Sequence, residues 1–466
     1  MKHNFLYLLL IALMYSCTPS DTKKDEKVNI DSSLTSILKT RELKAIVNFN
    51  ATDYYIDRGT PMGFQLEMLN SYCTFMNLKL KIIVKNNNRD EYKSLINNEA
   101  DILVGDINPT GLRRMFFNFT SPHSKSPLVL IQRKDSIDKF KNKVPNIKKV
   151  FELNQSSIIV PNHSSYYEYG KEFATKNNIH LNLAFDLENS TENLIEKVAL
   201  GEINYTICEQ KVAIANANLF RNIDYHIAIS DTLHQCWLLP KTSDSLLQSI
   251  NLWLEKFIKT NEYKAIYSRY YSTTYANQIL QNKKNYIKNR SISRWDKYIK
   301  KAARKNRWDW KLYAALIYQE SGFVPNLTGG GGCFGLLQLM PETGRIYGVT
   351  PSSSPETQIM RGANYLKYLE KQFSKKVKDK EQLSKFVVAS YNSGLGHVID
   401  AILLTEKYGK DPTTWDKNVE VYLRLKSNPK YFNDPIVKSG YYRGSFTTRF
   451  VDDVWARYEH YKNFVR

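Results

Sequence analysis

Residues Trp308–Phe323 read WDWKLYAALIYQESGF, and this stretch decides the fold of the C-terminal third of the chain. Its apolar residues recur every three or four positions, which predicts an amphipathic helix. Asp309 is a suitable N-terminal cap, and Ser321-Gly322 predicts the end of the helix. Glu320 then lies at the end of an apolar stripe, where burial raises the pKa of a carboxyl group, as a general acid requires. Periodicity alone favours the alternative, an exposed glutamate at a helix end.

Two further motifs follow Glu320 along the chain. Residues 329–341 read GGGGCFGLLQLMP, and residues 389–394 read ASYNSG. With the preceding Glu-Ser pair, this order resembles the lysozyme-like catalytic domain of the lytic transglycosylases, whose motifs are E-S, G-L-M-Q-(L/I)-M-P and A-x-Y-N-x-G. The similarity covers Ile292–Arg466. It implies a mainly α, lysozyme-like (α+β) domain that cleaves peptidoglycan glycan strands.

The resemblance also implies roles for single residues. Glu320 falls on the family's one catalytic acid, and Ser321 follows it as in the family. Gln338 falls on the glutamine that lines the sugar groove, and Tyr391 and Asn392 fall on the pair that contacts saccharide. The implied reaction protonates the bond between N-acetylmuramic acid and N-acetylglucosamine, after which the same carboxylate deprotonates the muramoyl C6 hydroxyl. The product carries a 1,6-anhydro ring.

The sequence departs from the family pattern at four positions. Gly329 stands where the family has serine, Cys333 replaces a common alanine, Leu337 replaces methionine, and Phe450 replaces tyrosine. The Gly-rich stretch 329–332 and Phe450 support an alternative function, a non-catalytic wall-binding or sensing lipoprotein with a degenerate lysozyme-like domain. The retained acid and the Tyr-Asn pair favour the enzyme.

The region before this domain alternates between strand-like and helix-like segments. Such alternation predicts an α/β layer with largely parallel sheets. The expected strands are Lys44–Asn48, Leu80–Val84, Ile102–Val104, Leu128–Ile131 and Ser157–Val160, and the expected helices include Phe64–Met76, Glu91–Asn97 and Thr191–Leu200. We predict an α/β domain over residues 38–272, a polar linker over 273–292 and the catalytic domain over 293–466.

Four motifs in the α/β region resemble the periplasmic solute-binding proteins for amino acids. They are GFQLEM at 63–68, EADI at 99–102, TGLR at 110–113 and FTSPH at 119–123. The resemblance implies a two-lobed fold with a ligand cleft. A solute-binding domain followed by a transglycosylase domain is the layout of the membrane-bound lytic murein transglycosylase F family. This layout suggests that amino acids or muropeptides regulate cleavage.

Ligand contacts in the first domain are expected from four residues. Arg113 can pair with a ligand carboxylate in bidentate fashion. Ser164 and Ser165 precede a helix whose N-terminal amides can hold a carboxylate. Glu209 falls where the family has an aspartate for the ligand ammonium group. The alternative is that Arg113 and Glu209 are surface residues on a fold kept for structure.

The N-terminal residues predict a targeting signal rather than a folded domain. Lys2 and His3 precede the apolar run Phe5–Met14, which is too short to span a bilayer and fits a secretory signal. The run ends at Cys17 in a pattern that resembles a bacterial lipoprotein signal, so we expect a signal peptide over 1–17, lipid on Cys17 and a polar tether over 18–37. The expected location is the outer membrane, facing the periplasm. The alternative is a plain signal peptide with a chance cysteine.

Composition limits the remaining function classes. The 466-residue chain carries 66 Lys+Arg and 46 Asp+Glu, a formal charge of +20. Such charge favours polyanions, but a secreted chain with no nucleic-acid module predicts no nucleic-acid partner. No CxxC or HExxH spacing is present, so we expect no metal and no cofactor. In an oxidising compartment we predict that Cys208 and Cys236 form a disulfide.

Overall fold

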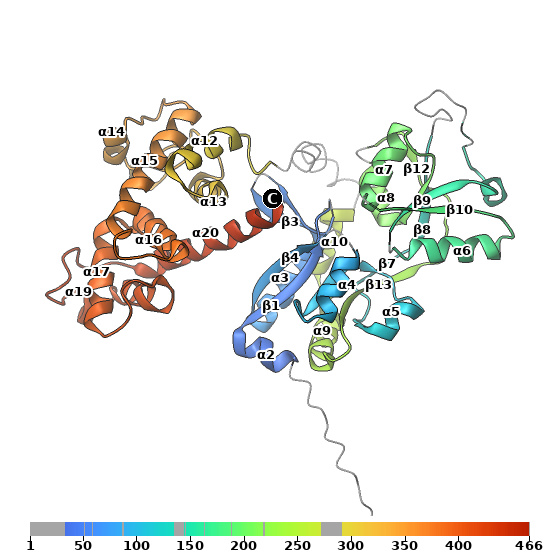
Figure 1. Cartoon of the computed structure of the whole chain (residues 1–466), viewed down its shortest axis with the longest axis horizontal. Coiled ribbons are helices and arrows are strands. Elements are labelled where there is room, and N and C mark those ends of the chain that lie inside the picture. Colours follow the sequence, from blue (N-terminus) through green and yellow to red (C-terminus); the bar gives the residue numbers. More distant parts are fainter. Residues whose placement is uncertain are drawn as a thin grey trace, which may run out of the picture.

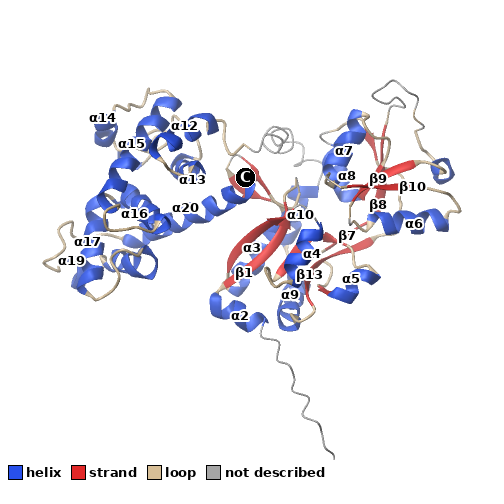
Figure 2. Ribbon diagram, viewed as in Figure 1, coloured by secondary structure: helices blue, strands red, loops and turns tan. Residues whose placement is uncertain are grey.

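The computed structural model describes residues 33–465, apart from 51, 58, 86–87, 135–143, 145, 163, 188, 218–219 and 272–290. The expected signal peptide, Cys17, most of the tether and most of the linker lie outside these residues. One lobe of the N-terminal domain (lobe 1) lies between the other lobe (lobe 2) and a helical C-terminal domain (Figures 1 and 2). Among the described helices, none combines the length and the apolar character that crossing a bilayer demands.

Lobe 1 is built on one mixed sheet with the strand order β4-β1-β5-β13-β6, and β7 pairs with β13. Three strands are parallel, and Ala45 of β1 lies opposite both Ile82 and Ile102. β13 runs antiparallel to β5 because it returns from the other lobe. The strands are β1 (Glu42–Asn48), β4 (Lys79–Lys85), β5 (Ile102–Ile107), β6 (Phe117–Phe119), β7 (Ser124–Ser126) and β13 (Leu233–Pro240).

Helices cover this sheet, and α3 forms over the residues Phe64–Met76 that the sequence predicts. Gly63, with φ +142°, begins α3, and Asn77 ends it in the left-handed conformation. The helices of lobe 1 are α2 (Ser33–Thr40), α3 (Phe64–Met76), α4 (Asn88–Ile96), α5 (Gly111–Phe116), α9 (Asp244–Phe257) and α10 (Asn261–Tyr271). Since α2 starts at Ser33 and buries Ile37, the polar tether ends earlier than the expected residue 37.

Lobe 2 is mostly antiparallel around its central strand, which differs from the prediction of largely parallel sheets. β8 (Leu128–Arg133) is buried along its whole length and pairs antiparallel with β11 (Thr206–Glu209) and β12 (Ile223–Asp224). Only β9 (Ser157–Pro161) and β10 (Asn182–Asp186) form a parallel pair in this lobe's described part. Its helices are α6 (Tyr166–Lys176), α7 (Thr191–Leu200) and α8 (Gln210–Ala217), with a short 3-10 turn η1 (Val150–Leu153).

The predicted disulfide between Cys208 and Cys236 is wrong. Both cysteines are free and buried. Cys208 lies on β11 opposite Val129, in the core of lobe 2, whereas Cys236 lies on β13 opposite Ile107, in the sheet of lobe 1. Placement in different lobes keeps the two thiols apart, although both residues lie on strands as expected.

The C-terminal domain is helical, and its extended segments are limited in the described chain to isolated bridges such as Phe334–Leu339. Ile292 is fully buried and the Asp296 carboxylate accepts hydrogen bonds from its backbone N–H, so ordered structure begins slightly before the expected residue 293. The helices are α12 (Asp296–Asn306), α13 (Trp310–Ser321), α14 (Pro341–Tyr347), α15 (Pro355–Phe373), α16 (Lys380–Ser393), α17 (Leu395–Lys407), α18 (Glu420–Leu425), α19 (Pro429–Phe432) and α20 (Gly444–Phe464), with short turns η2 (Gly330–Gly332) and η3 (Trp415–Val419).

The long helix α20 connects the two domains. It packs along α13 and α16, and its C-terminal end reaches lobe 1 at β4 and at the hairpin of β2 (Tyr55–Asp57) and β3 (Thr60–Met62) (Figure 1). The Tyr461 hydroxyl donates to the Gly59 carbonyl at 2.8 Å, and Thr60 Oγ1 lies 2.6 Å from the Tyr318 hydroxyl on α13. One continuous hydrophobic core therefore runs from lobe 1 into the C-terminal domain.

Candidate functional site

The helix that carries Glu320 forms as its sequence predicts. The Asp309 side chain accepts a hydrogen bond from the Lys311 N–H at 2.8 Å and caps the start of α13. Gly322 ends the helix with φ +57°, a left-handed conformation that glycine adopts without strain. The capped ends fix Glu320 in the last turn of a helix whose central residues are buried.

The Glu320 carboxyl group is partly buried, and burial alone raises its pKa to about 8. Removing a carboxylate from water disfavours the charged form. Among the described residues, no second carboxyl group contributes to this shift. Glu320 therefore holds a proton at neutral pH, in a place where it has no charged partner to stabilise the anion.

Tyr391 lies beside Glu320. Burial and the Glu320 charge both raise the pKa of the Tyr391 phenol well above its ordinary value. Its hydroxyl donates to the Leu337 carbonyl at 2.5 Å, and its ring packs against Tyr365 with a centroid distance of 5.4 Å. The structure thus brings together the end of α13, the loop around Leu337 and the end of α16, which are three distant segments of sequence.

Two residues expected to bind substrate instead donate hydrogen bonds to the backbone of the loop that follows α13. The Ser321 side chain is 6% exposed, and its hydroxyl donates to the Leu336 carbonyl at 2.8 Å. The Gln338 amide donates to the carbonyls of Leu327 and Gly335 at 2.9 and 2.8 Å. In this conformation Ser321 holds the loop against the end of α13, and Gln338 joins two parts of the loop to each other.

Two departures from the family pattern are coupled in space. The Cys333 thiol donates to Gln338 Oε1 at 3.2 Å. A Cβ atom on Gly329 would lie 2.2 Å from the same oxygen and 2.6 Å from the Cys333 sulfur. Glycine is therefore required at 329 while Cys333 and Gln338 keep these positions. Phe450 is partly buried and packs against the main core. The aromatic ring expected at this position is therefore present, but the hydroxyl of the family's tyrosine is not.

A buried polar network that sequence reasoning missed supports Asn392. Thr447 Oγ1 donates to Asn392 Oδ1 at 2.6 Å and lies 2.7 Å from the Tyr442 hydroxyl. The Tyr442 ring stacks on His397, with a centroid distance of 4.3 Å. Asn392 is exposed, and its side-chain oxygen is held by this hydrogen bond.

The network ends in an ion pair between Lys426 and Asp400. The Lys426 ammonium donates to Asp400 Oδ2 at 2.6 Å and to His397 Nδ1 at 3.0 Å. Asp400 also accepts from the backbone N–H groups of Lys438 and Ser439, and these bonds and Lys426 lower the pKa of its carboxyl group. The pair therefore anchors the segment that leads into α20, because it joins α17, the end of α18 and that segment.

In the N-terminal domain, the residues expected to bind ligand gather where the two lobes meet. Arg113 on α5 donates to the Asn108 carbonyl at 3.0 Å, and the Asn108 amide donates to Ser165 Oγ at 3.3 Å across the junction. Glu209 ends β11, where it is buried and accepts a hydrogen bond from the Tyr166 hydroxyl. Ser164 instead donates to the Pro161 carbonyl at 2.7 Å within its own turn.

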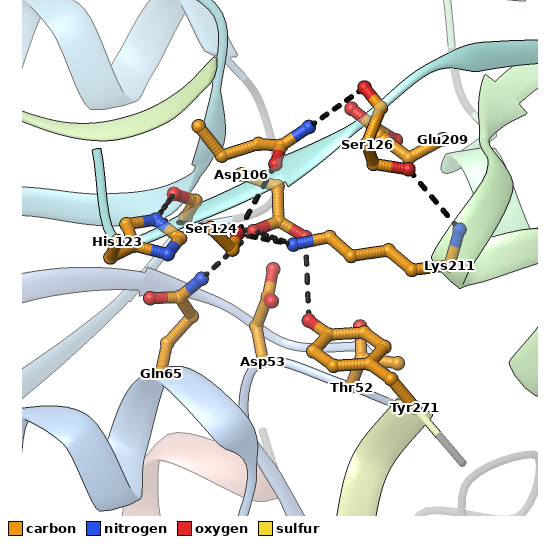
Figure 3. Close-up of polar contacts among 12 residues, drawn as sticks. Thr52, Asp53, Gln65, Asp106, His123, Ser124, Ser126, Glu209, Lys211 and Tyr271 are labelled. Carbon is orange, nitrogen blue, oxygen red and sulfur yellow. Dashed lines mark hydrogen bonds and ion pairs between the residues drawn. The ribbon is translucent and has the colours of Figure 1, made fainter. Parts of the chain in front are cut away.

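The centre of this junction is formed by residues that the motifs did not indicate. Lys211 of lobe 2 donates to Asp106 Oδ1 of lobe 1 at 2.7 Å and to Ser124 Oγ at 2.7 Å, and the Tyr271 hydroxyl donates to Asp106 Oδ2 at 3.3 Å (Figure 3). Lys211 follows Glu209 by two residues, and Asp106 lies near the carboxyl end of β5. Their meeting depends on how the lobes close, which spacing along the chain does not reveal.

His123 stands where the solute-binding motif has tyrosine. It is fully enclosed, and burial lowers its pKa to about 4. Its Nε2 atom lies 3.1 Å from the Gly105 carbonyl, which can only accept, so the neutral ring donates from Nε2. His123 thus lines the junction as a neutral side chain and offers no charged contact to a ligand.

Comparisons with known proteins match both domains. Residues 297–413 match the transglycosylase SLT domain family, and residues 43–273 match the bacterial extracellular solute-binding proteins, family 3. A membrane-bound lytic murein transglycosylase F from Desulfosudis oleivorans is 29% identical over 92% of this chain and 92% of its own length. One from Shewanella denitrificans is 27% identical over 98% of this chain and 88% of its own length.

A solved amino acid ABC transporter substrate-binding protein from Streptococcus pneumoniae, bound to L-arginine, matches 52% of this chain and 98% of that chain, with 18% identity and a TM-score of 0.44. The two matched domain families occur in the order that the motifs predict, and the relatives extend over nearly the whole chain. The chain therefore contains a family 3 solute-binding domain followed by a transglycosylase SLT domain, and over nearly its whole length it is similar to membrane-bound lytic murein transglycosylases F.

Proposed function

We propose that this protein cleaves the β-1,4 bond between N-acetylmuramic acid and N-acetylglucosamine in peptidoglycan and leaves 1,6-anhydromuramoyl ends. The class of enzyme, a lytic murein transglycosylase, follows from the family and its SLT domain. The observation that carries the finer proposal is the Glu320 carboxyl group, whose pKa burial raises to about 8. This group is protonated at neutral pH and ready to act as an acid.

In the first half of the reaction, Glu320 gives its proton to the glycosidic oxygen, and the bond from that oxygen to C1 of the muramoyl residue breaks. In the second half, the Glu320 carboxylate takes the proton of the C6 hydroxyl on the same residue, and that oxygen closes on C1. The acid is restored and no water is consumed. An intramolecular nucleophile has a high effective concentration, which removes the need for an activated water.

One carboxyl group is enough for this cycle. Glycosidases that use two place them about 5 to 9.5 Å apart, and at such separations a second carboxylate raises the pKa of the acid. In the described chain, burial is the one cause of the Glu320 shift. This supports a mechanism with a single acid that later serves as the base.

The neighbouring residues divide into two roles in this proposal. Tyr391 and Asn392 contact the sugar, since Tyr391 is close enough to Glu320 to feel its charge and Asn392 is exposed with its side-chain oxygen held by Thr447. Ser321 and Gln338 shape the site through the loop they hold, because their polar atoms bond to its backbone. We expect changes at the first pair to act on substrate binding, and changes at the second to act on stability as well.

Digestion of purified sacculi in water enriched in oxygen-18 tests the reaction. Ring closure predicts muropeptides with anhydro ends that carry no heavy oxygen, when the products are examined by mass spectrometry. Reducing ends that carry oxygen-18 would show hydrolysis and contradict the proposal. Ring closure within the substrate leaves no step at which solvent oxygen enters.

We also propose that ligand binding at the lobe junction regulates cleavage, with amino acids or muropeptides as the ligands. The β2–β3 hairpin follows Asp53 of the junction directly, and its Thr60 contacts Tyr318, two residues before Glu320 on α13. The Gly59 carbonyl of the same hairpin accepts hydrogen bonds from Tyr461 and Arg457 on α20. Through these direct contacts, a shift of this hairpin reaches α13, the helix that carries Glu320.

Cleavage of sacculi with and without added muropeptides tests this regulation. We expect the added ligands to change the rate for the wild type and to have less effect on Thr60→Val, which keeps the size of the side chain and loses its hydroxyl. Thr74→Val, on the far part of α3, is the matched control. Equal responses of Thr60→Val and the wild type would argue against this path.

Lipid attachment at Cys17 and location in the outer membrane, facing the periplasm, complete the proposal. Relatives are named as membrane-bound, and the sequence up to Cys17 resembles a lipoprotein signal. We expect Cys17→Ala to move the protein from the membrane fraction to the soluble fraction of the envelope. Retention of that variant in the membrane would contradict the anchor.

A further inference from the structure

The junction between the lobes contains a complete binding site for an ammonium group, occupied by the protein's own Lys211. The ammonium lies 2.7 Å from both Asp106 Oδ1 and Ser124 Oγ, and the Lys211 side chain is 4% exposed. The ring centroids of Tyr271 and Phe64 lie 4.7 and 5.7 Å from it. A carboxylate, a hydroxyl and two aromatic faces are the groups that bind a primary ammonium ion.

Acidic groups at the junction exceed the basic ones. Asp53, Asp106 and Glu209 influence one another and the Tyr271 phenol electrostatically, and Lys211 is the cation that bonds to one of them. Fully ionised, these groups carry three negative charges against one positive, and the neighbouring Arg113 adds a second positive charge at the edge of the junction. Buried charges are stable when they are paired. Because the negative charges outnumber the positive ones, at least one carboxylate can pair with a further cation.

Asp53 has an unused acceptor aimed into the junction. Its residue is 6% exposed, Asn50 donates to one carboxylate oxygen at 2.7 Å, and the other oxygen has no hydrogen-bond partner among the described residues. Figure 3 shows the Asp53 carboxyl group directed toward Asp106 and Lys211. The Asn108 side-chain oxygen, on the same junction, is buried and also without a partner in the described chain.

Titration behaviour agrees with a missing positive charge. Burial and then Asp106 raise the pKa of Asp53 well above its ordinary value. Burial and then Asp106 also raise the pKa of Glu209 to about 7, against the lowering effects of the Tyr166 hydroxyl and Lys211. A bound cation reverses both shifts, because an adjacent positive charge favours the ionised carboxylate.

A metal ion is less suited to this place than an organic cation. No group of three His, Cys, Asp or Glu side chains in the described residues is arranged to hold a metal. Aromatic faces, in contrast, favour ammonium groups. The neighbouring Arg113 and Ser165 add donors on the side toward α5 and α6, where a ligand carboxylate fits.

We propose that the lobe junction binds a small amino compound of net positive charge, with an ammonium group held between Asp53 and Asp106 beside Lys211. This ammonium is additional to the one that Glu209 is expected to bind. The inference rests on the proposed ligand-binding role of the N-terminal domain. It does not depend on the reaction at Glu320.

Calorimetric titration of the full chain tests the proposal with four probes. L-Lysine and cadaverine carry an ammonium at the end of an alkyl chain, L-norleucine matches lysine in length without that group, and L-glutamate is an anion. We expect lysine to bind at least about tenfold more tightly than norleucine, since hydrogen bonds to charged groups are the stronger ones, and glutamate not to bind. Cadaverine, which lacks the carboxylate, is expected to bind between lysine and norleucine.

The variant Asp53→Asn separates this site from the rest of the fold. Its amide oxygen still accepts from Asn50, so the turn is kept, while the ammonium loses its charged partner. We expect lysine affinity to fall about tenfold or more, with norleucine affinity unchanged. Asp90→Asn, an exposed carboxylate on α4, is the matched control.

Several outcomes would overturn the proposal. Equal affinity for lysine and norleucine, unchanged lysine binding by Asp53→Asn, or no binding of either cationic probe at about 10 mM, far weaker than the micromolar range of a specific ligand, each does so. Because the titration measures binding alone, a failure here leaves cleavage by Glu320 standing. A failure of cleavage likewise leaves the titration readable.

Discussion

Replacing Glu320 with glutamine removes a titrating group whose burial lowers the stability of the fold by an amount that depends on pH. The ordinary pKa of a glutamate is 4.5, and burial raises that of Glu320 to about 8. The folded chain therefore keeps a proton that the unfolded chain releases above pH 4.5. Stability falls as pH rises from 4.5 to 8, because the folded state binds more protons over that window.

The size of this effect follows from the shift. With one pKa unit equal to about 1.4 kcal/mol, the elevated pKa destabilises the fold by about 1 kcal/mol at pH 5 and about 3 kcal/mol at pH 7. The glutamine variant has no such dependence and nearly the same shape. We expect the stability of Glu320→Gln relative to wild type to increase by about 2 kcal/mol between these pH values.

Thermal unfolding at pH 5, 6, 7 and 8 measures the difference. For a domain of this size, 2 kcal/mol corresponds to about 4 to 8 °C in melting temperature. Glu342→Gln, an exposed glutamate on α14, is the matched control and is expected to follow the wild type at every pH. A constant difference between Glu320→Gln and wild type across this range would refute the raised pKa.

Three further predictions test the surroundings of the site. Thr447→Val is expected to raise the KM for glycan strands several-fold with a smaller effect on kcat, because Asn392 loses its positioning bond, while Thr448→Val keeps KM, as steady-state kinetics on soluble glycan strands will show. Gly329→Ser should lower thermal stability by about 1 to 3 kcal/mol, since the new Cβ overlaps the glutamine oxygen beside it. Tyr461→Phe should cost about 1 kcal/mol in urea unfolding through its lost bond to the hairpin carbonyl. Unchanged values in these assays would contradict the corresponding contacts.

Local patterns in the sequence predict α13, the helix that carries Glu320, well. The cap at Asp309, the stop at Gly322 and the apolar spacing between them are all properties of neighbouring residues, and the structure confirms each one. These features depend on the chain within a few turns, which is the range that periodicity describes. The burial of Glu320 is different, because periodicity alone favours an exposed glutamate at the helix end, whereas the structure partly buries this side chain.

Features that depend on distant segments were harder to predict. The Lys211–Asp106 pair joins the two lobes, and the Thr447–Asn392 bond joins α20 to α16. Whether Cys208 can form a disulfide with Cys236 likewise depends on which lobe each cysteine lies in. None of these partners is adjacent in sequence, and each is selected by how the lobes and helices pack.

The resemblance placed Ser321 and Gln338 in the site and left their side-chain bonding to the structure. Both side chains bond to the loop backbone, because buried polar atoms need partners and the loop supplies carbonyls at short range. The motif therefore marks a segment that must keep a certain shape. Motif matching alone does not distinguish such a residue from one that contacts sugar.

The most direct test of the central claim compares wild type with Glu320→Gln in the digestion of purified sacculi, with anhydromuropeptides counted by mass spectrometry. We predict that the wild type releases them and that the glutamine variant, folded and at least as stable at neutral pH, is slower by a factor of about 1,000 or more, as expected on losing both acid and base catalysis. Release of anhydromuropeptides by Glu320→Gln at the wild-type rate would contradict the claim that this carboxyl group performs both proton transfers.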